Sequence, residues 1–153
     1  MAPNDAESVI RSIRIAARPE TVFAFFTDPE KMVRWKGTHA LLDPRPGGVY
    51  RVNVTGGHIA QGEYVEIVPH RRIVITWGWE GDEVVPPGSS TVEIDLIPDG
   101  NGTIVRLTHR HLPADRRVSH GEGWEHYLGR LALAGAGGDP GPDPWVRPAA
   151  ATE

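Results

Sequence analysis

Residues 91–134, TVEIDLIPDGNGTIVRLTHRHLPADRRVSHGEGWEHYLGRLALA, contain the two patterns that decide the fold. Two stretches of alternating apolar and polar residues, 91–97 and 103–111, flank the turn Asp99-Gly100-Asn101-Gly102, and this arrangement predicts an antiparallel hairpin. Apolar side chains then recur at a 3.6-residue spacing over residues 114–134, which predicts one long amphipathic helix. A sheet with one apolar face must bury that face, so we expect the helix to cover it.

Alternation along the predicted strands assigns the side chains that face the helix. Residues 72–80 form a further predicted strand, which also carries two tryptophans on its apolar face. The residues predicted to point toward the interior from these strands and from the helix are Ile73, Ile75, Trp77, Trp79, Val92, Ile94, Leu96, Val105, Leu107, His109, His111, His120, Trp124, Leu128 and Leu131.

The N-terminal third predicts one strand and two short helices. Residues 8–16 are rich in β-branched side chains, which favour a strand. Pro19 at a first helical position opens a short buried helix over residues 19–27. Asp28 is placed to cap a second helix that runs to about Trp35. We interpret the following residues, 36–48, as a loop.

Further strands are predicted at 49–54 and 59–68, so the whole chain predicts an α+β fold. A curved six-stranded antiparallel sheet wraps around the long C-terminal helix, with the two short helices after the first strand. We expect one domain over residues 8–134, a flexible N-terminus over 1–7, and a disordered Gly/Pro-rich tail over 135–153, on which Trp145 is free to dock.

Composition excludes several classes of function. The chain has 153 residues, a net charge of −4 and scattered arginines, which argues against binding of nucleic acid. It has no cysteine, so disulfides and cysteine-based chemistry are excluded. We see no signal peptide at the N-terminus and no apolar run long enough for a membrane span, and we expect a cytoplasmic protein.

Five segments together resemble one branch of a known superfamily. They are PETVFAFFTDPEKMVRW at 19–35, the Gly-Gly turn at 43–48, GEYVEIVP at 62–69, Leu-Thr-His at 107–109, and HGEGWEHYLGRL at 120–131. In this order they resemble the activator of heat-shock-protein-90 ATPase homologue-like (AHSA-type) branch of the SRPBCC or START-like superfamily. The resemblance implies the helix-grip, or Bet v 1-like, fold. Members of the superfamily include lipid and polyketide carriers, cyclases and dehydratases.

The resemblance and the aromatic residues together predict a binding cavity between the sheet and the helix. We expect an apolar or aromatic ligand of lipid-like or polyketide-like character, although a core packed solid with aromatic rings stays an alternative. The branch often has a second tryptophan after Trp35, where this chain has Lys36, and we expect this to change the cavity mouth. The predicted ligand-binding residues are Trp35, Trp77, Trp79, His109, His111, His120, Trp124, Tyr127 and Leu128.

The histidines leave other chemistry open. His109 and His111 lie two apart on one predicted strand, and His120 is a third candidate, but no carboxylate with ligand spacing accompanies them, so we predict no metal and no cofactor. An enzyme of the cyclase, dehydratase or hydrolase kind is an alternative, with His109, His120 and Glu63 as candidate acids or bases.

The expected partner is therefore an apolar small molecule, with neither nucleic acid nor a membrane span. Val84 and Val85 in the long loop before residue 91 are interpreted as a lid or as a homodimer contact. Association with a chaperone stays a further alternative.

Overall fold

A computed structural model describes residues 8–146, which form one curved antiparallel sheet and the helices that cover it. The predicted flexible N-terminus, 1–7, and the end of the predicted tail, 147–153, lie outside the described residues. The elements in chain order are β1 (Val9–Ile15), α2 (Pro19–Thr27), α3 (Pro29–Met32), β2 (His39–Leu42), β3 (Val49–Asn53), β4 (Ile59–Val68), β5 (Arg72–Trp79), β6 (Ser90–Asp99), β7 (Gly102–Arg110), η1 (Ala114–Arg116) and α4 (Arg117–Gly135).

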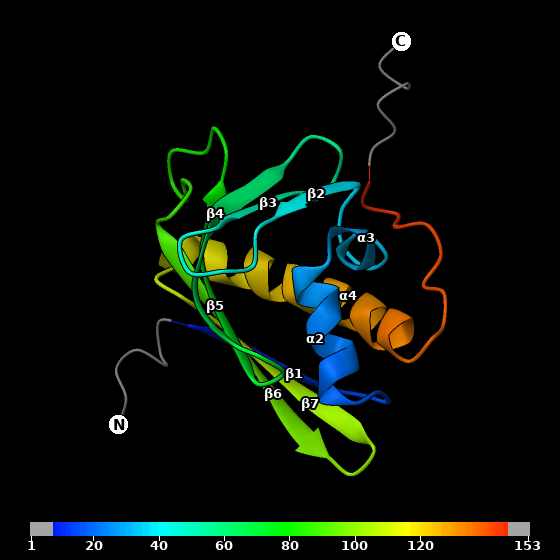
Figure 1. The fold of residues 1–153 in the computed structure, drawn as a ribbon. Helices are drawn as coiled ribbons and strands as arrows, with labels where there is room; N and C mark the ends of the chain where they lie inside the picture. Colours follow the sequence, from blue (N-terminus) through cyan, green and yellow to red (C-terminus); the bar gives the residue numbers. More distant parts are fainter. Residues whose placement is uncertain (1–7, 147–153) are drawn as a thin grey trace.

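The α+β fold with a long C-terminal helix is confirmed. The strands follow the order β1-β7-β6-β5-β4-β3-β2, and every neighbouring pair is antiparallel. Figure 1 shows the sheet curving around α4, with α2 and α3 at one end of this helix. None of the helices formed by residues 8–146 is long and apolar enough to cross a lipid bilayer.

The sheet has seven strands where six were predicted. The additional strand is β2, which lies inside the stretch interpreted as a loop and pairs only with β3. It has four residues, it follows Gly37 and it stands at the edge of the sheet, so it lacks the length and the clear alternation that mark the other strands.

The predicted faces of the central strands are confirmed except at His111, which is exposed and lies beyond the end of β7. On β5 the side chains of Ile73, Ile75 and Trp77 are buried, and on β7 His109 is fully buried beside Leu107. The long helix begins later than predicted, because residues 114–116 form a separate 3-10 turn before α4.

α4 approaches β1 closely at one point. A side chain at Gly121 would collide with the Arg11 guanidinium and come within 3.6 Å of Val9, so glycine lets the helix rest on the sheet there. Toward the start of α4, Gly123 has no atoms of other elements within 4 Å of where a Cβ would stand, so the helix borders open space on that side.

Candidate functional site

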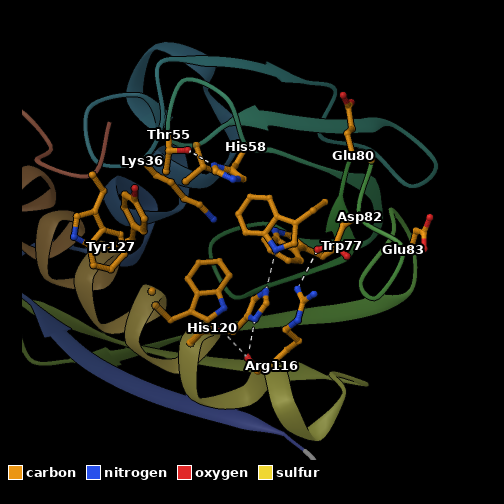
Figure 2. Close-up of a pocket in the computed structure, with 17 residues that line it drawn as sticks. Lys36, Thr55, His58, Trp77, Glu80, Asp82, Glu83, Arg116, His120 and Tyr127 are labelled. Carbon is orange, nitrogen blue, oxygen red and sulfur yellow. Dashed lines mark hydrogen bonds and ion pairs between the residues drawn. The ribbon is translucent and has the colours of Figure 1, made fainter. Parts of the chain in front are cut away.

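A cavity with a volume of about 770 Å³ lies between β5, the first half of α4 and the loop 80–89. The turn that joins β3 to β4 and the C-terminal segment complete its walls (Figure 2). Its aromatic lining comes from Trp77 and Trp79 on β5, Trp124 and Tyr127 on α4, and Trp145. Four of the five tryptophans of the chain therefore line one cavity.

The loop 80–89 is held against β5, which shapes the cavity mouth. Gly78 lets the loop fold back, because a Cβ at this position would collide with the Pro86 carbonyl. The backbone N–H of Trp79 donates to the backbone carbonyl of Val85 at 2.7 Å, and the Val85 side chain is completely buried. Val85 is thus a packing residue, whereas Val84 is exposed.

His109, which is buried behind the cavity lining, fixes the position of Trp124. The Trp124 indole N–H donates to His109 Nδ1 at 3.0 Å, so this nitrogen is unprotonated and Nε2 carries the hydrogen. Nε2 then donates to Ser90 Oγ at 2.8 Å, and this hydroxyl donates to the Trp77 carbonyl at 2.7 Å. Burial holds the pKa of His109 well below its usual value, and repulsion from His120 and Lys36, when these groups are protonated, lowers it further. His109 is therefore neutral, and both of its ring nitrogens are used.

His120 holds Trp79 in the same way at the cavity wall. The Trp79 indole N–H donates to His120 Nε2 at 3.0 Å, and His120 Nδ1 donates to the Arg116 carbonyl at 2.8 Å. Burial lowers the pKa of His120. Each histidine thus positions one tryptophan, and neither has a ring nitrogen left to accept or deliver a proton at a ligand.

Lys36 brings an amine into this aromatic interior. The turn after α3 places it there. The backbone N–H of Lys36 donates to the Met32 carbonyl at 2.9 Å. Gly37, with a φ of +90°, then directs the chain close to the backbone of β3. Nζ lies 4.0 Å from the centre of the Trp124 ring, and Figure 2 shows the side chain extending into the cavity. Burial lowers the pKa of Lys36 to about 7.

Two of the three carboxylates at the mouth, Asp82 and Glu80, form ion pairs, and the third is Glu83. Asp82 accepts from the Arg116 guanidinium at 3.0 Å and from the N–H groups of Val84 and Val85, and these contacts lower the pKa of Asp82. Glu80 forms an ion pair with Arg51 at 2.6 Å, which lowers the pKa of Glu80. The mouth therefore presents two ion pairs and the Glu83 carboxylate, and the interior presents rings and one amine.

The C-terminal segment closes one side of the cavity. Asp143 accepts from the Tyr127 hydroxyl at 2.7 Å and contacts His126 Nε2 at 2.8 Å. Burial alone would raise the pKa of Asp143, but hydrogen bonds from Trp145, Tyr127 and His126 lower it. The Trp145 ring stacks on His126 with centroids 3.8 Å apart. This described part of the predicted tail, residues 136–146, thus contacts α4.

The structure brings together five of the predicted site residues at the cavity and places the others elsewhere. The residues that line the cavity are Trp77, Trp79, His120, Trp124 and Tyr127. The residues buried behind this lining are Trp35, His109 and Leu128. His111 and Glu63 are exposed. β7 ends at Arg110 and His111 has a φ of +68°, so strand alternation stops there and the two histidines of this strand do not share a face.

Sequence reasoning missed Lys36 as a residue of the interior and missed the walls made by Thr55, His58 and Asp82. The signal available for Lys36 was its place directly after the buried Trp35 and before Gly37. Among residues 8–146 no group of three or more histidine, aspartate or glutamate side chains is arranged to hold a metal ion.

Comparisons with known proteins give the same fold and a family. A family model described as "Activator of Hsp90 ATPase homolog 1-like protein" matches residues 16–134. The solution structure of an AHSA1-like protein from Rhizobium etli is 55% identical, with a TM-score of 0.72, over 92% of this chain and 89% of that one. The crystal structure of CalU16 from Micromonospora echinospora is 31% identical, with a TM-score of 0.70, over 85% of this chain and 76% of that one.

A curated relative is longer than this chain. The mouse protein "Activator of 90 kDa heat shock protein ATPase homolog 2" is 28% identical over 97 residues, which are 61% of this chain and 27% of that protein. The match therefore covers about a quarter of the length of the mouse protein.

Proposed function

This chain belongs to the family of activator of Hsp90 ATPase homolog 1-like proteins, and we propose that it binds a planar aromatic or otherwise apolar small molecule in the cavity beside α4. The observation that carries the proposal is the lining of a roughly 770 Å³ cavity by four of the five tryptophans. Sites for small organic ligands have volumes of about 300–1,000 Å³ and are mostly apolar, with a few polar groups that orient the ligand.

The contacts of the tryptophans explain why the cavity favours rings. Trp79 and Trp124 have their indole N–H groups satisfied by His120 and His109, so they offer ring faces and edges to a ligand. Aromatic rings gain about 0.5–1.5 kcal/mol from stacked or edge contacts beyond the burial of their area. A ligand with fused rings makes several such contacts at once, whereas an alkyl chain makes none.

The enzyme alternative with His109 and His120 as acids or bases has less support. General acid–base catalysis needs a group within hydrogen-bond reach of the substrate. In this structure the described residues occupy both ring nitrogens of each histidine. Glu63, the third candidate, is exposed on β4.

A titration of intrinsic fluorescence tests the proposed binding, because the four cavity tryptophans report on any occupant. We expect 2-naphthol or flavone to change the emission with a saturable micromolar Kd, and palmitate to bind more weakly. Native mass spectrometry of the same mixtures gives the stoichiometry, which we expect to be one ligand per chain.

A matched pair of variants locates the binding. Trp79→Phe alters the cavity wall, whereas Trp35→Phe alters a ring that is 1% exposed and lies outside the cavity. We expect Trp79→Phe to weaken binding at least fivefold and Trp35→Phe to leave the Kd unchanged. Equal weakening by both variants, or no response to any of the three ligands, would contradict the proposal.

A second candidate, association with an Hsp90-type chaperone, is favoured by the name of the mouse relative. Purified Hsp90 mixed with this chain at micromolar concentration should then show a faster ATPase rate. If the rate does not change and the two proteins elute separately in gel filtration, this candidate is excluded.

A further inference from the structure

The interior of the cavity contains one amine in unusual surroundings. Lys36 is 4% exposed, and its Nζ lies over the Trp124 ring, with the rings of Trp35, Trp77 and Tyr127 centred within 6.0 Å. Figure 2 shows the side chain reaching from the wall opposite α4 toward the middle of the cavity. A ligand stacked on Trp124 is therefore brought against Nζ.

Lys36 has no ionic partner to keep it charged. Among residues 8–146, no carboxylate lies within ion-pair distance of its Nζ, and two of the carboxylates at the mouth, Glu80 and Asp82, are engaged by Arg51 and Arg116. A buried ammonium without a counter-ion is costly, so the neutral amine is favoured. The nearby histidine nitrogens already have hydrogen-bond partners. Among residues 8–146, the interior polar groups left for a ligand are the Trp77 indole N–H, which can only donate, and Lys36 Nζ, which is the one that can act as a nucleophile.

We propose that Lys36 is a nucleophile that captures the carbonyl group of an aromatic aldehyde or ketone as an imine. This inference rests on the proposed function, since the cavity must first hold the aromatic ring of the ligand. In the first step the Nζ lone pair forms a C–N bond to the carbonyl carbon, the C–O π bond breaks, and a proton moves from nitrogen to oxygen. In the second step the carbinolamine loses its hydroxyl group and the remaining N–H hydrogen as water, and the C=N bond forms. No oxidant or reductant is consumed.

The electrostatics of the cavity support both steps. Because burial lowers the pKa of Lys36 to about 7, roughly half of the amine is neutral at pH 7, compared with roughly one part in 3,000 for a lysine with its usual pKa of 10.5. Neutral lysines in apolar pockets are the ones that form Schiff bases. When the imine nitrogen takes up a proton from solvent it gains a positive charge, which the face of the Trp124 ring stabilises.

The small number of lysines makes the test clean. The chain has two lysines, and the other, Lys31, lies on α3 outside the cavity. We would incubate the whole protein with 2-naphthaldehyde, follow the near-ultraviolet absorbance of the conjugated imine, and then reduce with borohydride and map the modified peptide. We expect modification at Lys36 at least tenfold faster than at Lys31 or at the N-terminal amine, and a rate that levels off above about pH 7.

Variants and a non-carbonyl analogue separate the two proposals. Lys31→Arg should react as the unchanged protein does, and Lys36→Met should form no imine in the cavity. Both should still bind 2-naphthalenemethanol, which has the same rings without a carbonyl group. Should Lys36→Met fail to fold, the peptide map and the pH profile of the unchanged protein decide the question alone.

Three results would overturn the inference. If 2-naphthalenemethanol binds but the aldehyde modifies the amines at equal rates, Lys36 is not a nucleophile and the proposed function stands. If 2-naphthoate binds far more tightly than the alcohol and this preference is lost in Lys36→Met, with no imine formed, Lys36 is an ammonium anchor for acids instead. If none of the three naphthalene derivatives binds, the proposed function fails together with the inference.

Discussion

Trp35 and Lys36 are consecutive and both almost fully buried, yet their side chains have different surroundings. Trp35 lies in a packed end, where its indole N–H donates to the Phe25 carbonyl at 3.0 Å and its ring meets Phe26 edge to face. Lys36 lies in an open end, where its amine faces a cavity. The packed end stabilises the fold, whereas the open end has fewer packing contacts and leaves a cavity in which the Lys36 amine can meet a ligand.

The largest expected effect distinguishes the two ends by stability. Trp35→Ala removes a ring that is packed on all sides and should cost about 3–5 kcal/mol in the free energy of unfolding. Trp79→Ala removes a partly buried ring at the cavity wall and should cost about 1–2 kcal/mol while ligand binding is lost. Urea unfolding of both variants measures this; equal costs would mean that the interior has no open end.

Lys36→Met should stabilise the protein, by about 3 kcal/mol at pH 6. The shift of its pKa from 10.5 to about 7 corresponds to roughly 5 kcal/mol of penalty for the charged form, part of which the cation–π contact with Trp124 offsets. Between pH 7 and 10.5 the unfolded chain holds one more proton than the folded chain, so the stability of the unchanged protein rises with pH.

The advantage of Lys36→Met should therefore be largest below pH 7 and shrink as the pH rises toward 10.5. Urea unfolding at pH 6 and pH 9 checks this, with Lys31→Met as the matched control on α3. A stabilisation that is the same at both pH values would show that the buried amine is not the cause.

His109→Ala should cost about 2 kcal/mol, because it leaves the Trp124 indole N–H without its acceptor and Ser90 without its donor. The exposed His111→Ala should change stability by about 0.5 kcal/mol. The pKa of folded His109 lies far below the usual 6.5, so the unfolded chain binds a proton first as the pH falls.

The stabilisation from neutral His109 is thus complete above pH 6.5 and is lost at lower pH. Thermal melts between pH 7 and pH 4.5 should show a shallower pH dependence in His109→Ala than in the unchanged protein. A parallel dependence in both would assign the acid sensitivity to other groups.

The smallest effect concerns the C-terminal segment. Asp143→Ala removes the acceptor shared by Tyr127 and His126 and should cost about 1 kcal/mol. Release of Trp145 widens the mouth, so the association rate of 2-naphthol in stopped-flow fluorescence should increase. An unchanged rate would mean that this segment does not limit entry.

Much of the fold could be predicted because its signals are local. Alternation identified β5, β6 and β7 and their buried faces, and prolines together with Asp28 located α2 and the start of α3. β2 was not predicted because an edge strand of four residues is too short to show a recognisable alternation of apolar and polar residues.

The candidate site was harder to predict because its key contacts join distant segments. Nothing in the spacing of His109 and Trp124, or of Trp79 and His120, shows that each histidine would hold a tryptophan. The direction of Lys36 depends on one turn after a short helix, for which sequence periodicity offers no rule. The Gly/Pro-rich composition of residues 136–146 predicted disorder, and the contacts of Asp143 with α4 are tertiary.

The two tryptophan–histidine pairs have a consequence for hydrogen exchange. The Trp124 indole hydrogen is bound to a histidine with no exposed surface, so its exchange with deuterium requires the sheet and α4 to separate. The Trp79 indole hydrogen is bound to a half-exposed histidine at the cavity wall, so a movement at the mouth is enough. The exchange rates of these two indole signals, read from one nitrogen–proton spectrum, thus report on different motions. The rate for Trp79 reports on opening of the cavity, and the rate for Trp124 reports on unfolding of the whole domain.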